Sequence, residues 1–289
     1  MAAMNRQTHK SDPSPMIGAH FSTAGGLHHA LEEAERLDCR VAQLFTASPR
    51  QWKCHPPTAE AAALFIETQR RTGILAASHA SYLINLAGIG EPGAKSRAAF
   101  ADELRRCQTL AIPLLVIHPG TRGDQTEAKA LRTVAESLDI AIAESENTVT
   151  TVLLETTAGM GRGIGSTFEQ LAAIIDQSKT SKQLGICLDT CHVFAAGYDL
   201  RTEEAYAETM AALKAAMPLE RLRFFHVNDS VTGFRSHVDR HAHLGEGELG
   251  LNAFRFLLQD LRFTAIGKCL ETADDEKREA DFRILRRFV

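Results

Sequence analysis

Histidine and carboxylate side chains stand at, or directly after, the ends of short apolar runs in this sequence. Imidazole nitrogens and carboxylate oxygens together suit zinc or manganese better than calcium. A charged or imidazole group that ends an apolar strand is costly unless something pairs with it. We therefore expect these residues to share a metal site. They are His79, His118, Glu155, Asp189, His226 and Glu271.

Two short pairs extend this set. His192 follows Asp189 by three residues, and His241 follows Asp239 by two residues. Both spacings allow a carboxylate and an imidazole to bind one ion, although either pair alone occurs often by chance. With His192, Asp239 and His241, the set of candidate metal ligands becomes complete.

The size of this set indicates more than one ion. At about four ligands per catalytic zinc, with an open position for water and a carboxylate shared between ions, it predicts two or three metals. Its four carboxylates carry −4, so three divalent ions leave a formal +2 that could hold a phosphodiester. The whole chain has a formal charge of −4, whereas a protein that binds nucleic acid by bulk charge should be basic. The metal ions themselves would supply the positive charge.

The other histidines and cysteines have simpler interpretations. His237 and His243 flank the Asp239 and His241 pair, and spacing leaves open whether either is the true ligand. Cys187 and Cys191 flank Asp189, but a packed structural role is favoured over ligation. Three histidines have no partner nearby in the sequence and are predicted to lie on the surface: His28, His29 and His55.

A regular alternation of elements must position these residues. Short apolar runs rich in branched residues alternate with segments of helical period, which is typical of β/α units around a parallel sheet. Eight strands in one unbroken alternation favour a closed (β/α)8 TIM barrel over an open doubly wound sheet. The strands are predicted at Met16–His20, Val41–Phe45, Ile74–Ser78, Leu114–His118, Thr151–Glu155, Leu184–Asp189, Leu222–His226 and Lys268–Glu271. The helices are predicted at Gly25–Leu37, Ala59–Thr72, Lys95–Leu110, Glu127–Glu144, Phe168–Gln177, Glu203–Ala216, Leu251–Leu261 and Glu276–Phe288. In such a barrel the candidate ligands meet at the rim formed by the C-terminal strand ends.

The chain as a whole is predicted to be one domain, residues 16–289, after a flexible N-terminal tail of residues 1–15. Its 289 residues are near the usual size of one barrel, and no linker divides them. No apolar run approaches the roughly 20 residues of a membrane span, and the start lacks a secretory signal. The six scattered cysteines indicate reduced thiols, so we expect a cytoplasmic protein. The sequence has no GxGxxG or P-loop, and no nucleotide cofactor is expected.

With its candidate ligands in these positions, the chain resembles bacterial endonuclease IV, the apurinic/apyrimidinic endonuclease family 2 with a trinuclear zinc site. The resemblance runs from about Ile17 to the last helix. The segments that carry it are Gly18–Gly26, His79–Ala87, Gly185–His192, His226–Ser230, Asp239–His241, Leu244–Gly247 and Leu270–Thr272.

This resemblance implies how the ligands divide among three zinc ions per chain, with Mn²⁺ as an alternative at one or more sites. The first ion would be held by His79, His118 and Glu155. The second would be held by Glu155, Asp189, His226 and Glu271. The third would be held by His192, Asp239 and His241. Glu155 and Glu271 would be catalytic together with a metal-bound hydroxide.

The resemblance also implies the reaction and the partner. The substrate would be double-stranded DNA, cut 5′ to an abasic site during base excision repair, with a 3′-hydroxyl and a 5′-deoxyribose phosphate as products. Clearing of blocked 3′ ends, a monomeric state and a place in the bacterial cytosol or nucleoid are further implications. The positions that match the family's DNA-contacting residues are Arg50, Gln51, Trp52, Tyr82 and Leu83.

Two residues depart from the family pattern. Thr156 stands where the family has Asn, and we expect altered hydrogen bonding around the ligands. Arg235 stands where a glycine is expected before the Asp239 and His241 pair. Because glycine tolerates positive φ, we expect a changed path of this loop and the least secure geometry at the third metal.

Two alternative functions remain open from the sequence. One is a divalent-metal sugar isomerase or epimerase on the same barrel, since fold alone does not determine function. The ligand count and the loops around Arg50 and Tyr82 argue against it, because a small-sugar enzyme has no evident need for them. The other is a damaged-DNA binding barrel without catalysis, which has no need for the complete ligand set.

Overall fold

The strands of the computed structural model, which describes residues 15–272 and 276–289, close into a parallel barrel. They are β1 (Ile17–His20), β2 (Val41–Leu44), β3 (Leu75–His79), β4 (Leu114–Ile117), β5 (Thr151–Glu155), β6 (Leu184–Asp189), β7 (Leu222–His226) and β10 (Gly267–Leu270). β1 pairs with β2 on one side and with β10 on the other, which closes the barrel. The predicted TIM barrel is confirmed.

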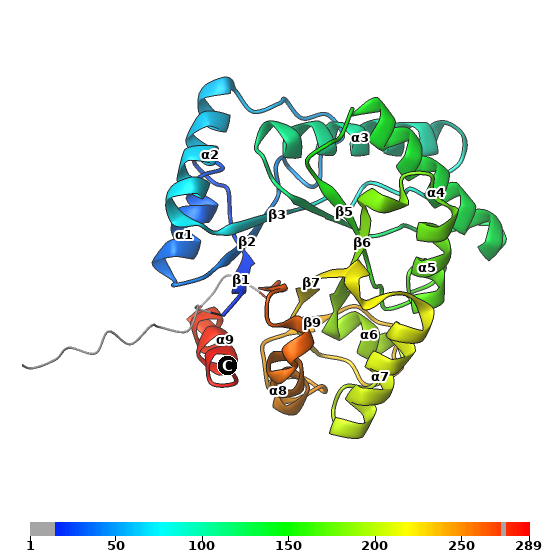
Figure 1. Ribbon diagram of the computed structural model, residues 1–289. Helices are drawn as coiled ribbons and strands as arrows, with labels where there is room; N and C mark the ends of the chain where they lie inside the picture. The colour runs from blue at the N-terminus through cyan, green and yellow to red at the C-terminus, as the bar shows by residue number, and fades with distance from the viewer. Residues whose placement is uncertain (1–14, 273–275) are drawn as a thin grey trace, which may run out of the picture.

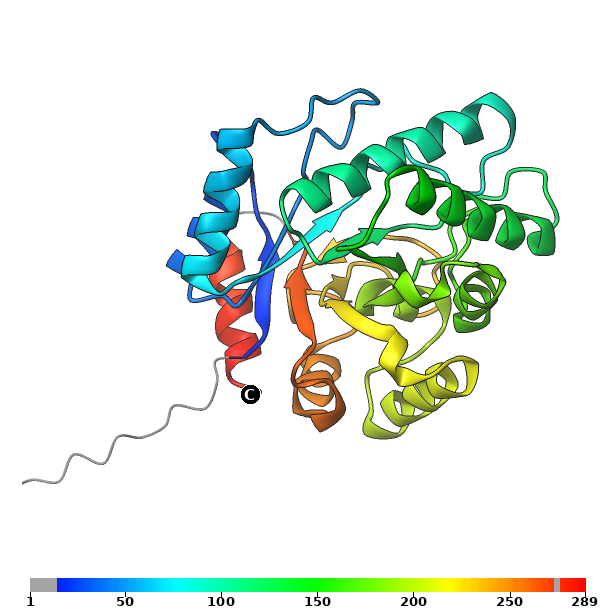
Figure 2. The same ribbon diagram turned by 45° about the horizontal axis from the view of Figure 1, so that its top comes forward.

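The helices surround the strands, as Figures 1 and 2 show from two directions. They are α1 (His29–Arg36), α2 (Ala59–Thr72), α3 (Gly90–Thr109), α4 (Glu127–Glu144), α5 (Phe168–Gln177), α6 (Thr190–Ala196), α7 (Glu203–Ala216), α8 (Leu251–Gln259) and α9 (Glu276–Arg286). The predicted bounds of α2, α4, α5 and α7 are confirmed. The prediction for α3 was wrong at its start, because the Gly-Glu-Pro-Gly segment from Gly90 to Gly93 forms its first turn. Proline fits there since the first helical N–H groups have no partner in any case.

Threonine side chains begin these well-predicted helices. Thr58, Thr126, Thr167 and Thr202 each accept a hydrogen bond from the backbone N–H three residues later. Such an N-cap contributes about 1 kcal/mol because it satisfies an N–H that the helix leaves without a partner. The capping residues therefore set where each helix begins and thus how long each β/α connection is.

Two elements beyond the strand ends were not predicted. Helix α6 follows β6 directly, at the point where β6 reaches the barrel rim. A short antiparallel pair, β8 (Asp229–Ser230) and β9 (His241–Ala242), follows β7 at the same rim. Both carry candidate metal ligands or lie next to them, so the rim on this side is more structured than expected.

The core has two parts. A large apolar cluster fills the space between strands and helices, and a smaller one fills the barrel interior. In the interior, the ring of Phe224 on β7 lies over Gly267 of the neighbouring strand β10. A Cβ on Gly267 would lie 2.7 Å from Cε2 of Phe224, so the ring occupies the space that a side chain would need.

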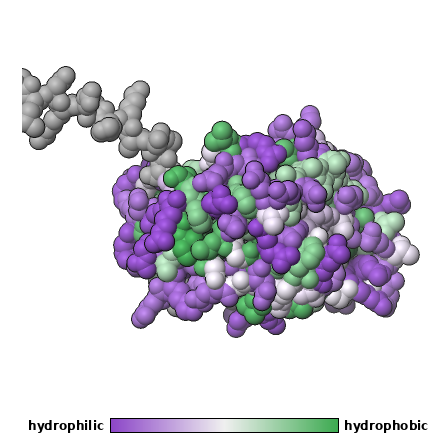
Figure 3. Space-filling view, turned by 90° about the horizontal axis from the view of Figure 1, so that it is seen from below, coloured by the Kyte–Doolittle hydropathy of each residue, from purple (hydrophilic) through white to green (hydrophobic). Residues whose placement is uncertain are grey.

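The outer surface is mainly hydrophilic on the face seen in Figure 3, with apolar residues in separate patches. Within the described part of the chain, none of the helices has the length and apolar character needed to cross a membrane. The predicted tail lies outside the described residues except for Pro15, and the boundary at residue 16 stays a prediction.

Replacing Gly267 tests the packing of the interior. We expect Gly267→Ala to lower the free energy of unfolding by about 1–3 kcal/mol, because the new methyl group overlaps the Phe224 ring. The measurement is urea-induced unfolding at one fixed zinc concentration. Gly233→Ala is the control, since its Cβ would meet no atom within 4 Å, and a change below about 0.5 kcal/mol is expected. Equal effects of the two substitutions would contradict this view of the interior.

Candidate metal centre

Glu155, at the end of β5, lies at the centre of a cluster of imidazoles. Its side chain is fully buried. Oε2 lies 3.0 Å from Nε2 of His79 and 3.2 Å from Nε2 of His118, while Oε1 lies 2.8 Å from Nδ1 of His226. Nδ1 of His192 is 3.3 Å from the same Oε1. One carboxylate thus joins side chains from β3, β7, α6 and the residue after β4 at the C-terminal rim.

All of the ligands predicted from the sequence come together in three groups. Within each group the candidate donor atoms lie within 4.8 Å of one another. The groups are His79, His118 and Glu155; Glu155, Asp189, His226 and Glu271; and His192, Asp239 and His241. This division is the one that the family resemblance implied, with Glu155 shared by two groups.

The hydrogen bonds of two histidines show which ring nitrogen is free for a metal. Nδ1 of His79 lies 2.8 Å from the carbonyl of Ala80, and Nδ1 of His192 lies 2.8 Å from the carbonyl of Thr156. A carbonyl only accepts, so Nδ1 carries the proton and Nε2 faces the cluster. Such hydrogen bonds to the distal nitrogen fix the orientation of metal-binding histidines. The chemistry of these donors therefore fits a metal centre.

Gln43 of β2 fixes a third histidine and one carboxylate. Its Nε2 donates to Oε1 of Glu271 at 2.6 Å, which leaves Oε1 to accept from Nε2 of His226 at 2.8 Å. His226 consequently turns Nδ1 toward Glu155. Gln43 also contacts Nδ1 of His20 at 3.1 Å, and burial lowers the pKa of His20 to about 3, so this ring stays neutral.

Asn228, just after β7, forms hydrogen bonds to two candidate ligands. Its Nδ2 donates to Oδ2 of Asp189 at 2.6 Å, and its Oδ1 accepts from the backbone N–H of Glu271 at 2.8 Å. Gln43, His20 and Asn228 were not predicted as functional residues from the sequence. The sequence does contain a signal for Gln43, because a polar residue stands there inside an apolar run, and in the structure its side chain is fully buried.

The electrostatic balance of the cluster keeps Glu155 ionised. Burial raises the pKa of Glu155, but the neighbouring His118 and His226 outweigh this and hold it well below its ordinary value. For His79, burial lowers the pKa, but the hydrogen bond to Glu155 outweighs this and holds the pKa of His79 above its ordinary value. Positive charge around this buried anion is thus strongly favoured, whether it comes from protons or from metal ions.

Helix α6 explains the spacing of Asp189 and His192. Asp189 is the N-cap of α6, and its Oδ1 accepts from the backbone N–H of His192 at 3.0 Å. The capping turn therefore places the imidazole of His192 on the same side as the carboxylate. Thr156 supports this turn, because its hydroxyl accepts from the backbone N–H of Asp189 at 2.9 Å. Thr156 was expected to alter the hydrogen bonding around the candidate ligands, and in the structure it contacts the backbone of Asp189 directly.

The loop before Asp239 keeps left-handed backbone without glycine. Arg235 has φ 62° and His237 has φ 53°. The loop is held on the end of α6, since the N–H of Arg235 donates to the carbonyl of Phe194 and that of His237 to Ala195. Oδ2 of Asp239, at the end of this loop, lies 3.1 Å from Nε2 of His192, and the expected effect of Arg235 on the third group stays a prediction.

The remaining histidines and cysteines lie apart from these groups or bind elsewhere. Nδ1 of His237 contacts the carbonyl of Ala158, and Nδ1 of His243 contacts Asp281 at 2.7 Å. Cys191 lies within 4.8 Å of donor atoms of Asp189 and His241. Its thiol, however, donates to the carbonyl of Arg240, and burial raises its pKa to about 12, which opposes the thiolate that a metal needs.

A cleft opens over the cluster. It has a volume of about 330 Å³ and is lined by His79, Tyr82, His118, His192, Asp239, Arg240, His241 and Glu271. Tyr82 is 66% exposed, and its ring makes an edge contact with Phe45. Of the predicted DNA-contacting residues, Tyr82 therefore stands directly beside the cluster.

The other predicted DNA-contacting residues lie on the loop that carries Tyr82 and on the loop after β2. Trp52 and Leu83 line a neighbouring pocket of about 370 Å³, where the ammonium of Lys95 lies 4.1 Å from the Trp52 ring centre. Arg50 and Gln51 are exposed on the same loop as Trp52. The hydroxyl of Ser81 donates to the carbonyl of Pro49 at 2.7 Å and ties the two loops together.

Comparison with known proteins places this architecture in a family. Residues 31–289 match the model of the xylose isomerase-like TIM barrel. The probable endonuclease 4 of Geobacter sulfurreducens is 45% identical over 278 residues, which cover 94% of each chain. That of Trichlorobacter lovleyi is 44% identical, over 94% of this chain and 99% of the relative.

Solved structures give the same result. Endonuclease IV from Thermus thermophilus superimposes with a TM-score of 0.86 at 35% identity, over 95% of this chain and 98% of that one. A D-tagatose 3-epimerase-like protein superimposes with a TM-score of 0.73 at 18% identity, over 94% and 96%, and shares the fold alone. The extent and identity of these matches show that the chain belongs to the endonuclease IV family.

Proposed function

We propose that this protein hydrolyses the DNA phosphodiester 5′ to an abasic site and leaves a 3′-hydroxyl and a 5′-deoxyribose phosphate. Its family supports a DNA endonuclease. The observation that carries the proposal is the meeting of five imidazoles and four carboxylates in three groups around the buried Glu155. A cluster of this size suits several ions acting on one phosphate group.

The three groups would each hold one divalent ion, and zinc fits the mixture of nitrogen and oxygen donors. When bound, such ions lower the pKa of water and neutralise the non-bridging oxygens of a phosphodiester. The chain's own part is to keep the donors in place. Gln43 and Asn228 hold Glu271, while the carbonyls of Ala80 and Thr156 hold His79 and His192.

Glu155 and Glu271 take different positions in this proposal. Glu155 is fully buried and connects two groups, so its role is to hold donors on both sides at a fixed separation. Glu271 is 15% exposed and lines the cleft, so its carboxylate lies within reach of a substrate. We therefore assign both as catalytic, with Glu271 nearer the reacting phosphate.

The loops beside the cleft would select the lesion. A second cavity, of about 310 Å³, lies next to the cluster and is lined by His79, Tyr82, His118, Ile117 and Met160 among others. An abasic nucleotide has no base to unpair or unstack, so turning it out of the helix into such a cavity costs little. Tyr82, Leu83 and Arg50 would fill the gap that it leaves in the DNA.

The sugar epimerases that share this fold do not support a sugar substrate here. Their likeness to this chain is in the fold alone, at 18% identity. The exposed ring of Tyr82 lines the cleft, and the loop of Arg50 and Trp52 is joined to the Tyr82 loop by the hydrogen bond from Ser81 to Pro49. These features match a large, extended substrate such as DNA better than a single sugar.

Incision of a defined duplex tests the proposal. We expect the zinc-loaded protein to cut a duplex with one abasic site and leave a 3′ end that a polymerase extends. Removing the metal with a chelator should abolish incision and lower the thermal midpoint of unfolding, because ions bound only to the folded state stabilise it. Added Zn²⁺ should restore both. Turnover of a ketose or aldose, with no cleavage of the duplex by fully loaded protein, would overturn the proposal.

Glu271→Gln tests the exposed ligand. The amide keeps the size of the side chain but lacks its charge, and we expect incision to fall by more than about 100-fold, beyond the usual effect of changing an outer partner of a ligand. Circular dichroism should show an unchanged fold. Glu136→Gln on the exposed side of α4 is the control and should keep full activity. Near-normal turnover by Glu271→Gln would remove Glu271 from the site.

Gln43→Leu tests the support of the ligands. Leucine fits the volume but makes neither of the hydrogen bonds to His226 and Glu271, so metal affinity should fall by about 10–100-fold. The measurement is the rate at which a chelator removes zinc from the folded protein, followed without any substrate. Gln43→Glu offers a comparison, since it retains an acceptor for His226 but repels Glu271. Wild-type zinc retention in the leucine variant would show that Gln43 has no such role.

A further inference from the structure

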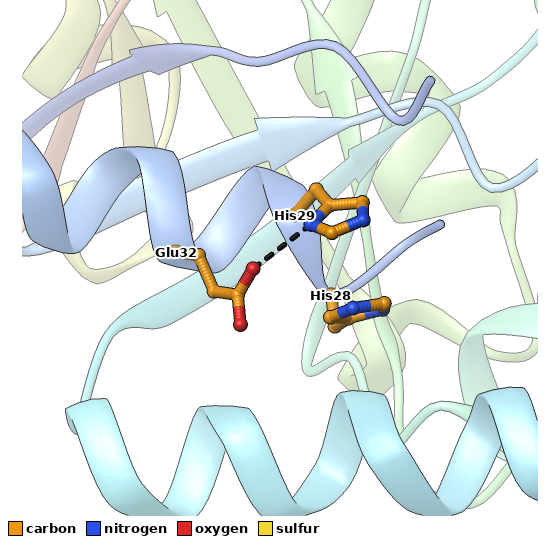
Figure 4. A group of neighbouring side chains, drawn as sticks. All are labelled: His28, His29 and Glu32. Atoms are coloured by element: carbon orange, nitrogen blue, oxygen red, sulfur yellow. Dashed lines mark hydrogen bonds and ion pairs between the residues drawn. The ribbon is translucent and has the colours of Figure 1, made fainter. Parts of the chain in front are cut away.

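A further group of side chains that could hold a metal ion lies outside the centre described above. His28, His29 and Glu32 stand together at the start of α1, as Figure 4 shows. One donor atom from each lies within 4.8 Å of the others. The predicted surface position of His28 and His29 agrees with the structure. The prediction that they have no partners was wrong, because His29 contacts Glu32. Nδ1 of His29 lies 2.8 Å from Oε2 of Glu32. The ring centres of His28 and His29 lie 4.1 Å apart.

The spacing at the start of α1 brings Glu32 next to both histidines. Glu32 follows His28 by four residues and His29 by three, and residues at these spacings are neighbours on a helix surface. The side chains of His29 and Glu32 are each 47% exposed, so water and ions reach them freely. The donor atoms of this group are therefore close together in the folded protein and accessible to ions in solution.

Two glycines make room for the rings. Gly25 and Gly26 precede the helix, with φ of 84° and 156°. A Cβ on Gly26 would lie 2.7 Å from Cε1 of His28, and one on Gly25 would lie 3.3 Å from Cδ2 of His29. Both imidazoles therefore pack against glycine backbone, which limits their positions before an ion binds. Less conformational entropy is then lost when an ion binds.

We propose that His28, His29 and Glu32 bind one divalent transition-metal ion, such as Zn²⁺, separately from the centre around Glu155. Two imidazole nitrogens and one carboxylate oxygen are an established zinc donor set with a fourth position for water. Tetrahedral zinc holds its donors about 3.3 Å apart, given bonds of about 2.0–2.2 Å. The pair His29 and Glu32 needs to open only slightly from 2.8 Å, and the ion displaces the proton between them.

The surroundings set the expected strength. The positive end of the α1 dipole disfavours a cation here, while the carboxylate of Glu32 compensates for it. With three donors and high exposure, this site should bind zinc more weakly than the buried centre. The loop that carries it leaves β1 after His20, so the site lies at the same end of the barrel as the centre.

Counting bound metal tests the proposal. The wild-type protein, with its buried centre saturated, is dialysed against rising concentrations of free Zn²⁺, and zinc per chain is measured. We expect one more ion per chain in wild type than in the double variant His28→Ala, His29→Ala. Glu32→Gln should weaken this additional binding by at least about tenfold. In spectra of ¹⁵N-labelled histidine, the ring nitrogens of His28 and His29 should shift with the added zinc.

The control is His55→Ala, which removes an exposed histidine that belongs to none of the candidate metal groups. This variant should bind as much zinc as wild type. Equal zinc content of the double variant and wild type would overturn the proposal, and so would unshifted His28 and His29 resonances. Incision activity is not used, so the result does not depend on the proposed nuclease function.

Discussion

Burial of a carboxylate at the centre of the barrel rim is the constraint on which the rest of this structure depends. Glu155 has no exposed surface, and its two oxygens contact imidazoles at the ends of three other strands and one on α6. An anion removed from water in this way is costly unless positive charge surrounds it. The neighbouring side chains therefore have to be arranged so that cations, either protons or metal ions, lie on both sides of this group.

The barrel meets this constraint through its geometry. Parallel strands bring their C-terminal ends to one rim, so residues far apart in the sequence face each other without any special turn. Amides then hold the charged groups at a fixed orientation, because Gln43 and Asn228 each form hydrogen bonds to two candidate ligands. Beyond the strand ends, the capping turn of α6 carries the candidate ligand His192, and the loop packed on α6 leads to the candidate ligands Asp239 and His241.

Much of this arrangement was predictable from local sequence. Apolar runs ending in His or a carboxylate predicted the strands and the meeting of the ligands, and β5, β6 and β7 have the predicted bounds. Helix α6 was missed because Thr-Cys-His-Val-Phe-Ala-Ala is short and apolar enough to continue a strand or loop. The role of Gln43 was missed for a different reason. Its partners lie at the ends of β7 and β10, and no local pattern records a contact across so great a separation.

The bond between Gln43 and Glu271 joins residues separated by 228 positions in the chain. β1 pairs with both β2 and β10, so the contact between Gln43 and Glu271 forms only once the last strand has been synthesised and inserted. An unfinished or truncated polypeptide consequently lacks the complete set of donors, whatever local structure it has formed. Closure of the barrel by its last strand is therefore a precondition for the complete set of donor atoms.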